Sequence, residues 1–470
     1  MTKRLFIETV GCQMNVLDSE LVVAALRNHG YTLTNDPHQA DVVLFNTCSV
    51  RQRAEDKIYS AVGKLRRWKQ DHPAAILGVI GCMAQRQQEQ IFARVPYVDL
   101  VVGPGQLHRM AELLQQASSG ERSQVAVSLG RKSGSREQIK RSHEAFESLR
   151  DPTMRPTPFQ AYLRIQIGCD KFCSYCVVPA TRGPEQSRAP EEIVSEARTL
   201  AEQGCLEITL LGQTVNSYRH RAAGRTTSLA ELLAQLHDIE GIRRLKFVTS
   251  FPKGMTRTLL ETVRHLPKCS PYLHVPLQSG SNAVLRRMNR GYTVEEYREM
   301  MREIREIIPE AAVSSDFIVG FCGETEWDFE QTVSAVEEFR FKNSFIFKYS
   351  EREGTRAAES VADDVPYPVK QQRNNHLLAI QNAISEQENR AFLGQVVQVL
   401  VEGPSKASAK KSAAGSMRQL VGRTHCDRIV VFDARPEQIG HILPIQISDA
   451  SAHTLFGQPR VAEAAPLPIE

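Results

Sequence analysis

The 470-residue chain has no long hydrophobic run. Its longest nearly apolar segment, AAILGVIGCMA at 74–84, is much shorter than the roughly 18 residues that a membrane-spanning helix needs. The first residues, MTKRLFIETVGC, lead directly into a strand-like segment and show neither the apolar region nor the small-residue cleavage site of a secretory leader. We therefore expect no membrane anchor and a cytoplasmic location.

The chain also has too few cysteines for a disulfide scaffold, ten in 470 residues. In a reducing compartment, clustered thiols are more often metal ligands. The net charge is only +4, but between Arg390 and Arg460 nine Lys or Arg residues stand against five Asp or Glu residues, an excess of four. Such a surplus is typical of a surface that faces RNA or DNA, and equally of an ordinary solvated basic surface.

The length exceeds what one hydrophobic core normally serves, so several domains are expected. Residues 1–117 alternate short apolar, β-branched runs with amphipathic segments, which predicts an open parallel sheet with helices on its faces. The same alternation occurs six times between 155 and 388. Six β/α units are too few for a closed eight-stranded barrel and predict a partial (β/α)6 barrel, with chemistry at the carboxyl ends of its strands. Residues 389–463 predict a small all-β barrel.

The predicted fold class is thus α/β with a small all-β barrel at its C-terminal end. Helix starts support the helical segments: Pro190 precedes two glutamates, and Ser228 and Thr293 each stand three residues before a glutamate, the spacing of a capping box. The predicted segments are an N-terminal domain at 1–117, a linker at 118–154, a core domain at 155–388, a barrel domain at 389–463 and a tail at 464–470.

Three cysteines stand within eight residues in GCDKFCSYCVVP at 168–179, namely Cys169, Cys173 and Cys176. A structural zinc site needs four ligands, and no fourth ligand lies nearby in the sequence. A cubane iron–sulfur cluster has four irons, so three thiolates hold three of them and leave one open. That open iron can chelate the amino and carboxylate groups of a small molecule. The spacing therefore favours a cluster, with zinc as the alternative.

A second set of three cysteines is spread along the N-terminal domain. Cys12, Cys48 and Cys82 each follow a strand candidate, in VGC, NTC and IGC. In an open parallel sheet the loops after the strands share one edge, so these thiols should converge. Any one of them alone would be read as a small buried residue. Together they predict a second three-thiolate site, again with one open iron.

Motifs along the chain resemble those of the radical S-adenosylmethionine methylthiotransferases, and most closely the MiaB-type branch that makes 2-methylthio-N6-dimethylallyladenosine in tRNA. The resemblance extends from about 4 to 450 and includes an N-terminal methylthiotransferase domain, a radical SAM core and a TRAM RNA-binding barrel. The matching motifs are GCQMN at 11–15, NTCSVR at 46–51, YVDLVVGP at 97–104, GCDKFCSYCVVPATRG at 168–183, LLGQTVNSY at 210–218, LHVPLQSGS at 273–281, SSDFIVGF at 314–321 and GRT at 422–424.

The resemblance implies two [4Fe-4S] clusters and S-adenosylmethionine as cofactors. Cys169, Cys173 and Cys176 would hold the radical-generating cluster, while Cys12, Cys48 and Cys82 would hold an auxiliary cluster that supplies sulfur. One S-adenosylmethionine would methylate a sulfur and a second would yield the radical that removes hydrogen from adenine C2. The implied partners are the tRNA anticodon stem-loop, whose bases can be splayed out for recognition, and a flavodoxin- or ferredoxin-like electron donor. A monomer is expected, and the source of replacement sulfur is unassigned.

Six further positions are expected to contact S-adenosylmethionine, although ordinary packing at the rim would also account for them. They lie where the second, fourth and fifth core strands end: Gly212, Gln213, Asn216, Gln278, Ile318 and Gly320. No catalytic residue is assigned beyond the cluster ligands.

The sequence departs from the family pattern at Cys322, where a proline is common, and we do not count this thiol as a ligand. Cys205, Cys269 and Cys426 match no ligand pattern and are expected to be structural. A basic insertion at 404–418 either adds phosphate contacts or has no role. Two alternative substrates keep the same chemistry, threonylcarbamoyl-adenosine in tRNA and a ribosomal-protein aspartate. A non-catalytic iron–sulfur or zinc RNA-binding protein is the alternative of another class.

Overall fold

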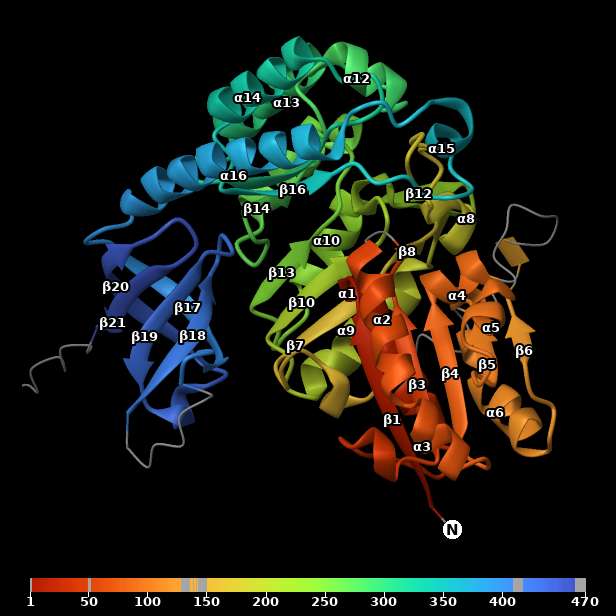
Figure 1. Cartoon of the computed structure of the whole chain (residues 1–470). Coiled ribbons are helices and arrows are strands. Elements are labelled where there is room, and N and C mark those ends of the chain that lie inside the picture. Colours follow the sequence, from red (N-terminus) through yellow and green to blue (C-terminus); the bar gives the residue numbers. More distant parts are fainter. Residues whose placement is uncertain are drawn as a thin grey trace, which may run out of the picture. The chain divides into compact units, whose positions relative to one another are not determined.

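The computed structural model describes residues 2–49, 52–127, 136, 137, 139, 140, 142, 150–408 and 417–460 (Figure 1). The chain divides into two compact units. The first comprises Met1–Phe251, Arg287–Arg290 and Ser350–Ala362, and the second comprises Pro252–Arg286, Gly291–Tyr349 and Asp363–Glu470.

The first unit begins with a six-stranded parallel sheet in the order β2-β1-β3-β4-β5-β6. Its central strands are buried on both faces, which explains their continuous apolar sequences, VVLFNT and ILGVIG. The strands are β1 (Lys3–Val10), β2 (Tyr31–Leu33), β3 (Val42–Thr47), β4 (Ile76–Gly81), β5 (Leu100–Val102) and β6 (Gln124–Ala126). The open parallel sheet predicted for this part of the chain is confirmed.

Helices cover both faces of this sheet and form one apolar core on each side. Leu17 and Leu21 of α1 belong to one core, and Ile58 and Val62 of α2 belong to the other. The helices are α1 (Gln13–Arg27), α2 (Gln52–Lys64), α3 (Arg66–Asp71), α4 (Cys82–Gln87), α5 (Gln90–Arg94) and α6 (Met110–Ser118). Sequestering both faces leaves the carboxyl edge of the sheet as the place where loops can gather.

The first unit continues with half of the core domain, a parallel sheet in the order β13-β10-β7. Helix α10 begins at the predicted capping box, in which Ser228 and Glu231 bond reciprocally. The elements are β7 (Gln160–Arg164), β8 (Gln166–Ile167), β9 (Gln186–Ser187), β10 (Glu207–Leu211), β11 (Arg219–Ala222), β12 (Arg225–Ser228), β13 (Arg244–Phe247), α8 (Val178–Arg182), α9 (Pro190–Glu202), α10 (Leu229–His237) and α15 (Arg356–Ser360).

The second unit holds the other half, a parallel sheet in the order β14-β15-β16. The predicted capping box of Thr293 and Glu296 is present at the start of α13. The elements are β14 (Tyr272–His274), β15 (Ala312–Val319), β16 (Asn343–Lys348), α11 (Arg257–His265), α12 (Asn282–Arg287), α13 (Val294–Ile307), α14 (Glu326–Phe339) and α16 (Tyr367–Arg390). The six predicted β/α strands therefore exist as two three-stranded sheets.

A closed five-stranded barrel ends the second unit, in the order β17-β18-β19-β21-β20, and confirms the predicted all-β domain (Figure 1). Its interior is filled by alternate apolar side chains, among them Val399, Leu420, Phe432 and Ile445. The strands are β17 (Val396–Pro404), β18 (Arg418–Thr424), β19 (Ile429–Ala434), β20 (Ile442–Ala450) and β21 (Leu455–Pro459).

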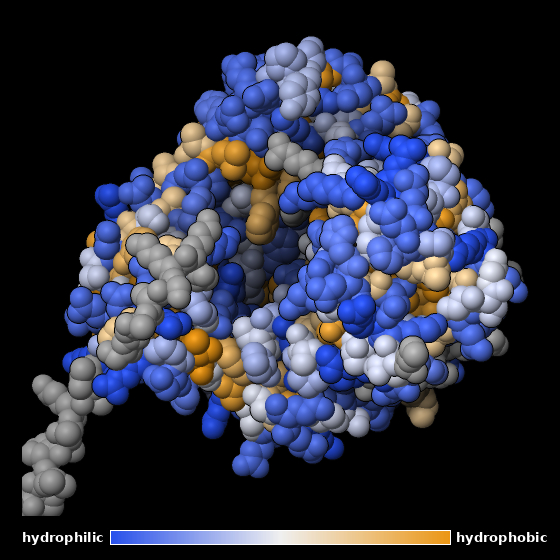
Figure 2. Space-filling model, turned by 60° about the horizontal axis from the view of Figure 1, so that its bottom comes forward, coloured by the Kyte–Doolittle hydropathy of each residue, from blue (hydrophilic) through white to orange (hydrophobic). Residues whose placement is uncertain are grey.

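The predicted domain limits stay predictions. Within the predicted linker, β6 pairs in parallel with β5, while 128–135 and 143–149 lie outside the described residues. The same holds for 409–416 of the basic insertion and for the tail at 464–470. No helix in the described part of the chain is long and apolar enough to cross a membrane. The face seen in Figure 2 is mainly hydrophilic, with apolar residues in small scattered groups.

Gly457 in β21 gives a test of how tightly the barrel closes. A Cβ at this position would lie 2.4 Å from the carbonyl oxygen of Gln446, a backbone atom that cannot move aside. We expect Gly457→Ala to destabilise the protein by roughly 1–3 kcal/mol, as overpacking does. Gly63→Ala is the matched control, because nothing lies within 4 Å of its added Cβ in helix α2. Thermal unfolding should show a lower Tm for Gly457→Ala only, and equal Tm values would contradict the close packing.

Candidate functional site

The cysteines of the N-terminal domain come together at the carboxyl edge of its sheet. Cys12, Cys48 and Cys82 follow β1, β3 and β4, which are neighbours in the sheet. The thiol of Cys48 hydrogen-bonds that of Cys12, and Cys12 and Cys82 interact through their charges. The predicted convergence of three thiols that lie far apart in the sequence is therefore present in the structure.

Two asparagines tie the loops of this triad together. Asn15 Oδ1 accepts a hydrogen bond from Cys12 Sγ at 3.1 Å, and Asn15 Nδ2 donates to Asn46 Oδ1 at 2.8 Å. Asn46 Nδ2 in turn donates to the backbone oxygen of Asn15 at 2.8 Å and to Ser19 Oγ at 2.9 Å. The amide pair is fully buried, so it fixes the start of helix α1 against strand β3 and with it the place of Cys12.

Two glycines allow the triad's loops to approach one another. Gly11 has φ +154°, and a Cβ there would lie 2.6 Å from Cys48 Cβ. Gly81 has φ +94°, and a Cβ there would lie 2.3 Å from Asn46 Oδ1. Side chains at these positions would push the thiols apart, which explains why a glycine directly precedes Cys12 and Cys82.

An arginine from the core domain completes the surroundings of this triad. Arg182 Nε donates to Cys82 Sγ at 3.2 Å. The hydrogen bond from Cys48 lowers the pKa of Cys12 to about 6, with help from the charge of Arg182. Burial raises the pKa of Cys82, although Arg182 opposes this. The site thus stabilises negative charge on sulfur unevenly, most strongly at Cys12.

The second triad lies in the loop that follows β8. Cys169 and Cys173 are buried and Cys176 is half-buried, and the charges of the three thiols act on one another. Burial raises the pKa of Cys169, and it raises that of Cys176 to about 12. Arg290 Nη1 donates to Cys173 Sγ at 3.0 Å, so this triad also receives a buried arginine.

Both triads fit a cluster held by three thiolates. Each brings three thiols to one place and directs a guanidinium at one sulfur, as suits a sulfur-rich anionic group. Beside the N-terminal triad, Arg182 Nη1 is buried and has no hydrogen-bond partner among the described residues. No group of three or more His, Cys, Asp or Glu residues in the described ranges is arranged to hold a single metal ion. The assignment of all six thiols as ligands stays a prediction.

The predicted S-adenosylmethionine contacts at the end of β10 lie beside the second triad. Gln213 carries a buried Oε1 with no hydrogen-bond partner among the described residues, and its neighbour Thr214 places Oγ1 3.4 Å from Cys169 Sγ. Gly212 packs against Gln166. Asn216 bonds the backbone of Phe251 with both halves of its amide, at 2.7 and 2.8 Å. The amide of Asn216 is therefore already engaged by the backbone of Phe251, whereas Oε1 of Gln213 is free to accept a hydrogen bond.

The remaining predicted contacts lie in the second unit. Gln278 has φ +75° and a buried Oε1 without a hydrogen-bond partner in the part of the chain that is described. Its backbone oxygen accepts from the N–H of Ile318 at 3.0 Å. The N–H of Gly320 donates to Glu324 Oε1 at 2.8 Å, and a Cβ on Gly320 would meet the side chain of Lys370. These three positions surround the carboxyl end of β15.

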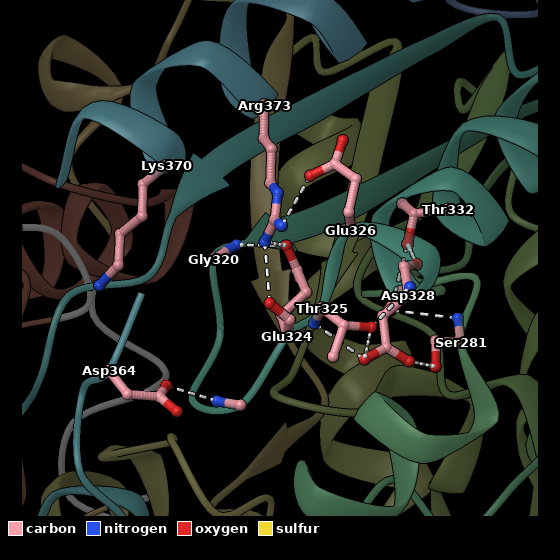
Figure 3. A network of polar contacts seen from close by, with 12 residues as sticks. Ser281, Gly320, Glu324, Thr325, Glu326, Asp328, Thr332, Asp364, Lys370 and Arg373 are labelled. Atoms are coloured by element: carbon pink, nitrogen blue, oxygen red, sulfur yellow. Dashed lines mark hydrogen bonds and ion pairs between the residues drawn. The ribbon is translucent and has the colours of Figure 1, made fainter. Parts of the chain in front are cut away.

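A polar network fixes the turn after β15 (Figure 3). Arg373 of α16 donates to Glu324 Oε1 at 2.8 Å and to Glu326 Oε2 at 2.9 Å, while the N–H of Gly323 donates to Asp364 at 2.6 Å (Figure 3). Burial raises the pKa of Glu324, and Arg373 opposes this. The turn that carries Gly320 is therefore fixed by Arg373 and Asp364, two residues that are not part of the turn.

The four other cysteines lie apart from the triads' contacts. The thiol of Cys322 is buried, and burial raises its pKa. Cys205 and Cys269 are fully or nearly fully buried, and Cys426 Sγ lies 3.3 Å from Thr424 Oγ1. That Cys205, Cys269 and Cys426 are structural stays a prediction.

Sequence reasoning missed the side chains that support the triads. Glu185 is one of them: it acts electrostatically on Cys169, burial raises its own pKa, and its Oε2 has no hydrogen-bond partner among the described residues. A signal existed, because most of these residues stand within the motifs around the cysteines. The missed residues are Asn15, Asn46, Arg182, Glu185 and Arg290.

The pKa of Cys12 predicts its reactivity in the iron-free protein. Since the thiolate is the reactive form, alkylation of this exposed residue should increase with pH around a midpoint of about 6 and level off above it. Cys48→Ala removes the main cause of the low pKa and should move the midpoint towards alkaline pH. Mass spectrometry of iodoacetamide-labelled peptides measures both, and a midpoint near 9 in the unsubstituted protein would contradict the hydrogen bond from Cys48 to Cys12.

Three known protein families match successive parts of this chain. The chain matches the Uncharacterized protein family UPF0004 over residues 4–103, the Radical SAM superfamily over 163–336 and the TRAM domain over 390–459. A radical S-adenosylmethionine methyltransferase, TsrM, from Kitasatospora setae, with cobalamin and a [4Fe-4S] cluster bound, shares the fold with a TM-score of 0.55. It is 16% identical and covers 76% of this chain and 77% of its own.

Two relatives align along almost their whole length. The tRNA-2-methylthio-N(6)-dimethylallyladenosine synthase of Rhodopirellula baltica is 62% identical over 467 residues, which is 99% of this chain and 98% of the relative. The synthase of the same name from Burkholderia ambifaria is 41% identical over 466 residues, 97% of each chain. The chain therefore belongs to the family of tRNA-2-methylthio-N(6)-dimethylallyladenosine synthases, a family of radical S-adenosylmethionine methylthiotransferases.

Proposed function

We propose that this chain converts N6-dimethylallyladenosine next to the anticodon of tRNA to its 2-methylthio derivative. The observation that carries the proposal is the 62% identity to a synthase of this name over nearly the full length of both chains. The arrangement of the cysteines supports it, because two separate triads suit an enzyme that both generates a radical and inserts sulfur.

Membership in the radical SAM superfamily implies a [4Fe-4S] cluster and S-adenosylmethionine. We assign this cluster to Cys169, Cys173 and Cys176, and we propose a second one at Cys12, Cys48 and Cys82. When bound, the clusters supply the electron for reductive cleavage and the sulfur for transfer. The protein's own contribution is to hold the thiols in place, to direct Arg290 at Cys173, and to offer Gln213 as a buried acceptor for the cosubstrate.

The barrel of the second unit is the proposed RNA-binding element. Lys406, Arg418, Arg435 and Arg460 are exposed on it, while its apolar residues fill the interior. Exposed cations on a small barrel bind the phosphate backbone without reading its sequence. This leaves selection of the adenosine to the core domain. We further propose a flavodoxin- or ferredoxin-like electron donor and a monomeric enzyme.

Two other substrates suit the same chemistry, threonylcarbamoyl-adenosine in tRNA and a ribosomal-protein aspartate. The names of the relatives favour dimethylallyladenosine. We expect cells that lack this gene to lose 2-methylthio-N6-dimethylallyladenosine, and cells that regain it to recover the nucleoside. Mass spectrometry of digested tRNA measures both. An unchanged level of this nucleoside, together with loss of methylthio-threonylcarbamoyl-adenosine or of the modified aspartate, would reject the proposal in favour of one alternative.

The roles of the two triads are tested separately. Anaerobically reconstituted protein should contain about eight irons, four in each cluster. Replacing Cys169, Cys173 and Cys176 by Ala should leave about four irons and abolish 5′-deoxyadenosine formation.

Replacing Cys12, Cys48 and Cys82 by Ala should also leave about four irons, spare the cleavage of S-adenosylmethionine and prevent methylthio transfer. Iron analysis and chromatography of the products measure these outcomes. Cleavage that continued without the first triad, or methylthio transfer that continued without the second, would reject the corresponding assignment.

A further inference from the structure

Arg182 is a buried cation that the proposed chemistry does not yet use. It is the last residue of helix α8, six residues after Cys176, and it is 2% exposed. Its Nε donates to Cys82 Sγ at 3.2 Å, and its Nη2 bonds Asp18 Oδ2 at 2.7 Å. The side chain thus extends from the loop of one triad to a cysteine of the other.

One nitrogen of this guanidinium lacks a partner. Arg182 Nη1 is buried and makes no hydrogen bond within the described residues, although Nε and Nη2 do. Buried donors are normally satisfied, since leaving one unpaired costs its hydration. The charges that act on Arg182 include those of Asp18, Cys82 and Cys12. The side chain that carries the unpaired nitrogen therefore lies close to two thiols of the N-terminal triad. A sulfur-rich anion at this triad would provide the missing acceptor.

We propose that Arg182 is a positioning residue of the auxiliary cluster, donating from Nε to the Cys82 thiolate and from Nη1 to a sulfur of the cluster. This inference rests on the proposed second cluster at Cys12, Cys48 and Cys82. Hydrogen bonds to the sulfurs and a nearby positive charge stabilise the more negative, reduced state of an iron–sulfur cluster. Arg182 therefore raises the reduction potential of this cluster and orients the loop of Cys82.

A purely structural ion pair with Asp18 is the competing explanation, and the chain offers a matched control for it. Arg164 of β7 is equally buried, and its Nη1 bonds the other oxygen of Asp18, also at 2.7 Å. If the two arginines serve only to neutralise Asp18, replacing either should have the same consequence. If Arg182 acts on the cluster, only its replacement should change the cluster's properties.

The experiment uses the full chain with Cys169, Cys173 and Cys176 replaced by Ala, so that the auxiliary cluster alone remains. Arg182→Met, Arg182→Lys and Arg164→Met are compared in this parent by iron content and by potentiometric titration followed by electron paramagnetic resonance. Arg182→Met should shift the midpoint potential to more negative values, Arg182→Lys should shift it less, and Arg164→Met should leave it near the parent's. Loss of iron from Arg182→Met but not from Arg164→Met would also support the proposal.

An unchanged potential in Arg182→Met, or an equal shift in Arg164→Met, would overturn it. Should Arg182→Met fail to fold, the lysine variant decides, because it keeps the charge but cannot donate from two nitrogens: an unchanged potential in Arg182→Lys then overturns the proposal. A parent that holds no cluster at all would instead reject the proposed function of the auxiliary triad, so the two failures are distinguishable.

Discussion

The candidate site of the first unit depends on the pairing of the Asp18 carboxylate with two arginines. It lies on helix α1 of the N-terminal sheet domain and is bonded by Arg164 of β7 and Arg182 of α8, both from the core domain. All three groups are buried. Removing one partner from such an arrangement costs about 3–5 kcal/mol, because the remaining charge stays in the interior without compensation. Well-packed apolar residues in place of these three charged groups could stabilise the protein equally well. The ion pairs therefore contribute specificity, because they permit one arrangement of the N-terminal sheet domain and the core domain.

That arrangement places Arg182, a residue of the core domain, in contact with Cys82 of the N-terminal domain. Because Arg182 bonds Asp18 and Cys82 together, the position of helix α8 and the position of the Cys82 loop are set by the same guanidinium. Cys176, the last of the three cysteines in the second triad, lies two residues before this helix begins. Among the described residues, the Cys169–Cys176 loop and the loop of Cys82 are thus connected through a short helix and the side chain of Arg182.

The fold and the cysteine positions could be predicted because they follow from local patterns. Apolar runs alternate with amphipathic segments, capping boxes begin α10 and α13, and parallel strands place Cys12, Cys48 and Cys82 at one edge. The supporting residues could not be predicted this way. Arg182 is 100 positions from Cys82, and no periodicity links a guanidinium in one domain with a thiol in another. The predicted S-adenosylmethionine contacts stay predictions, since Asn216 already bonds Phe251 while Gln213 and Gln278 have unused acceptors.

The two triads differ in how their geometry is specified, and this affects which changes in chain length each can tolerate. Strand pairing, rather than the number of intervening residues, places Cys12, Cys48 and Cys82, so insertions in the loops at the opposite edge of the sheet leave their thiols where they are. The other triad lies within a single loop, where adding one residue between Cys169 and Cys176 would turn a thiol away from its neighbours. The spacing between the N-terminal cysteines can therefore change without moving their thiols, whereas the spacing within the loop cannot.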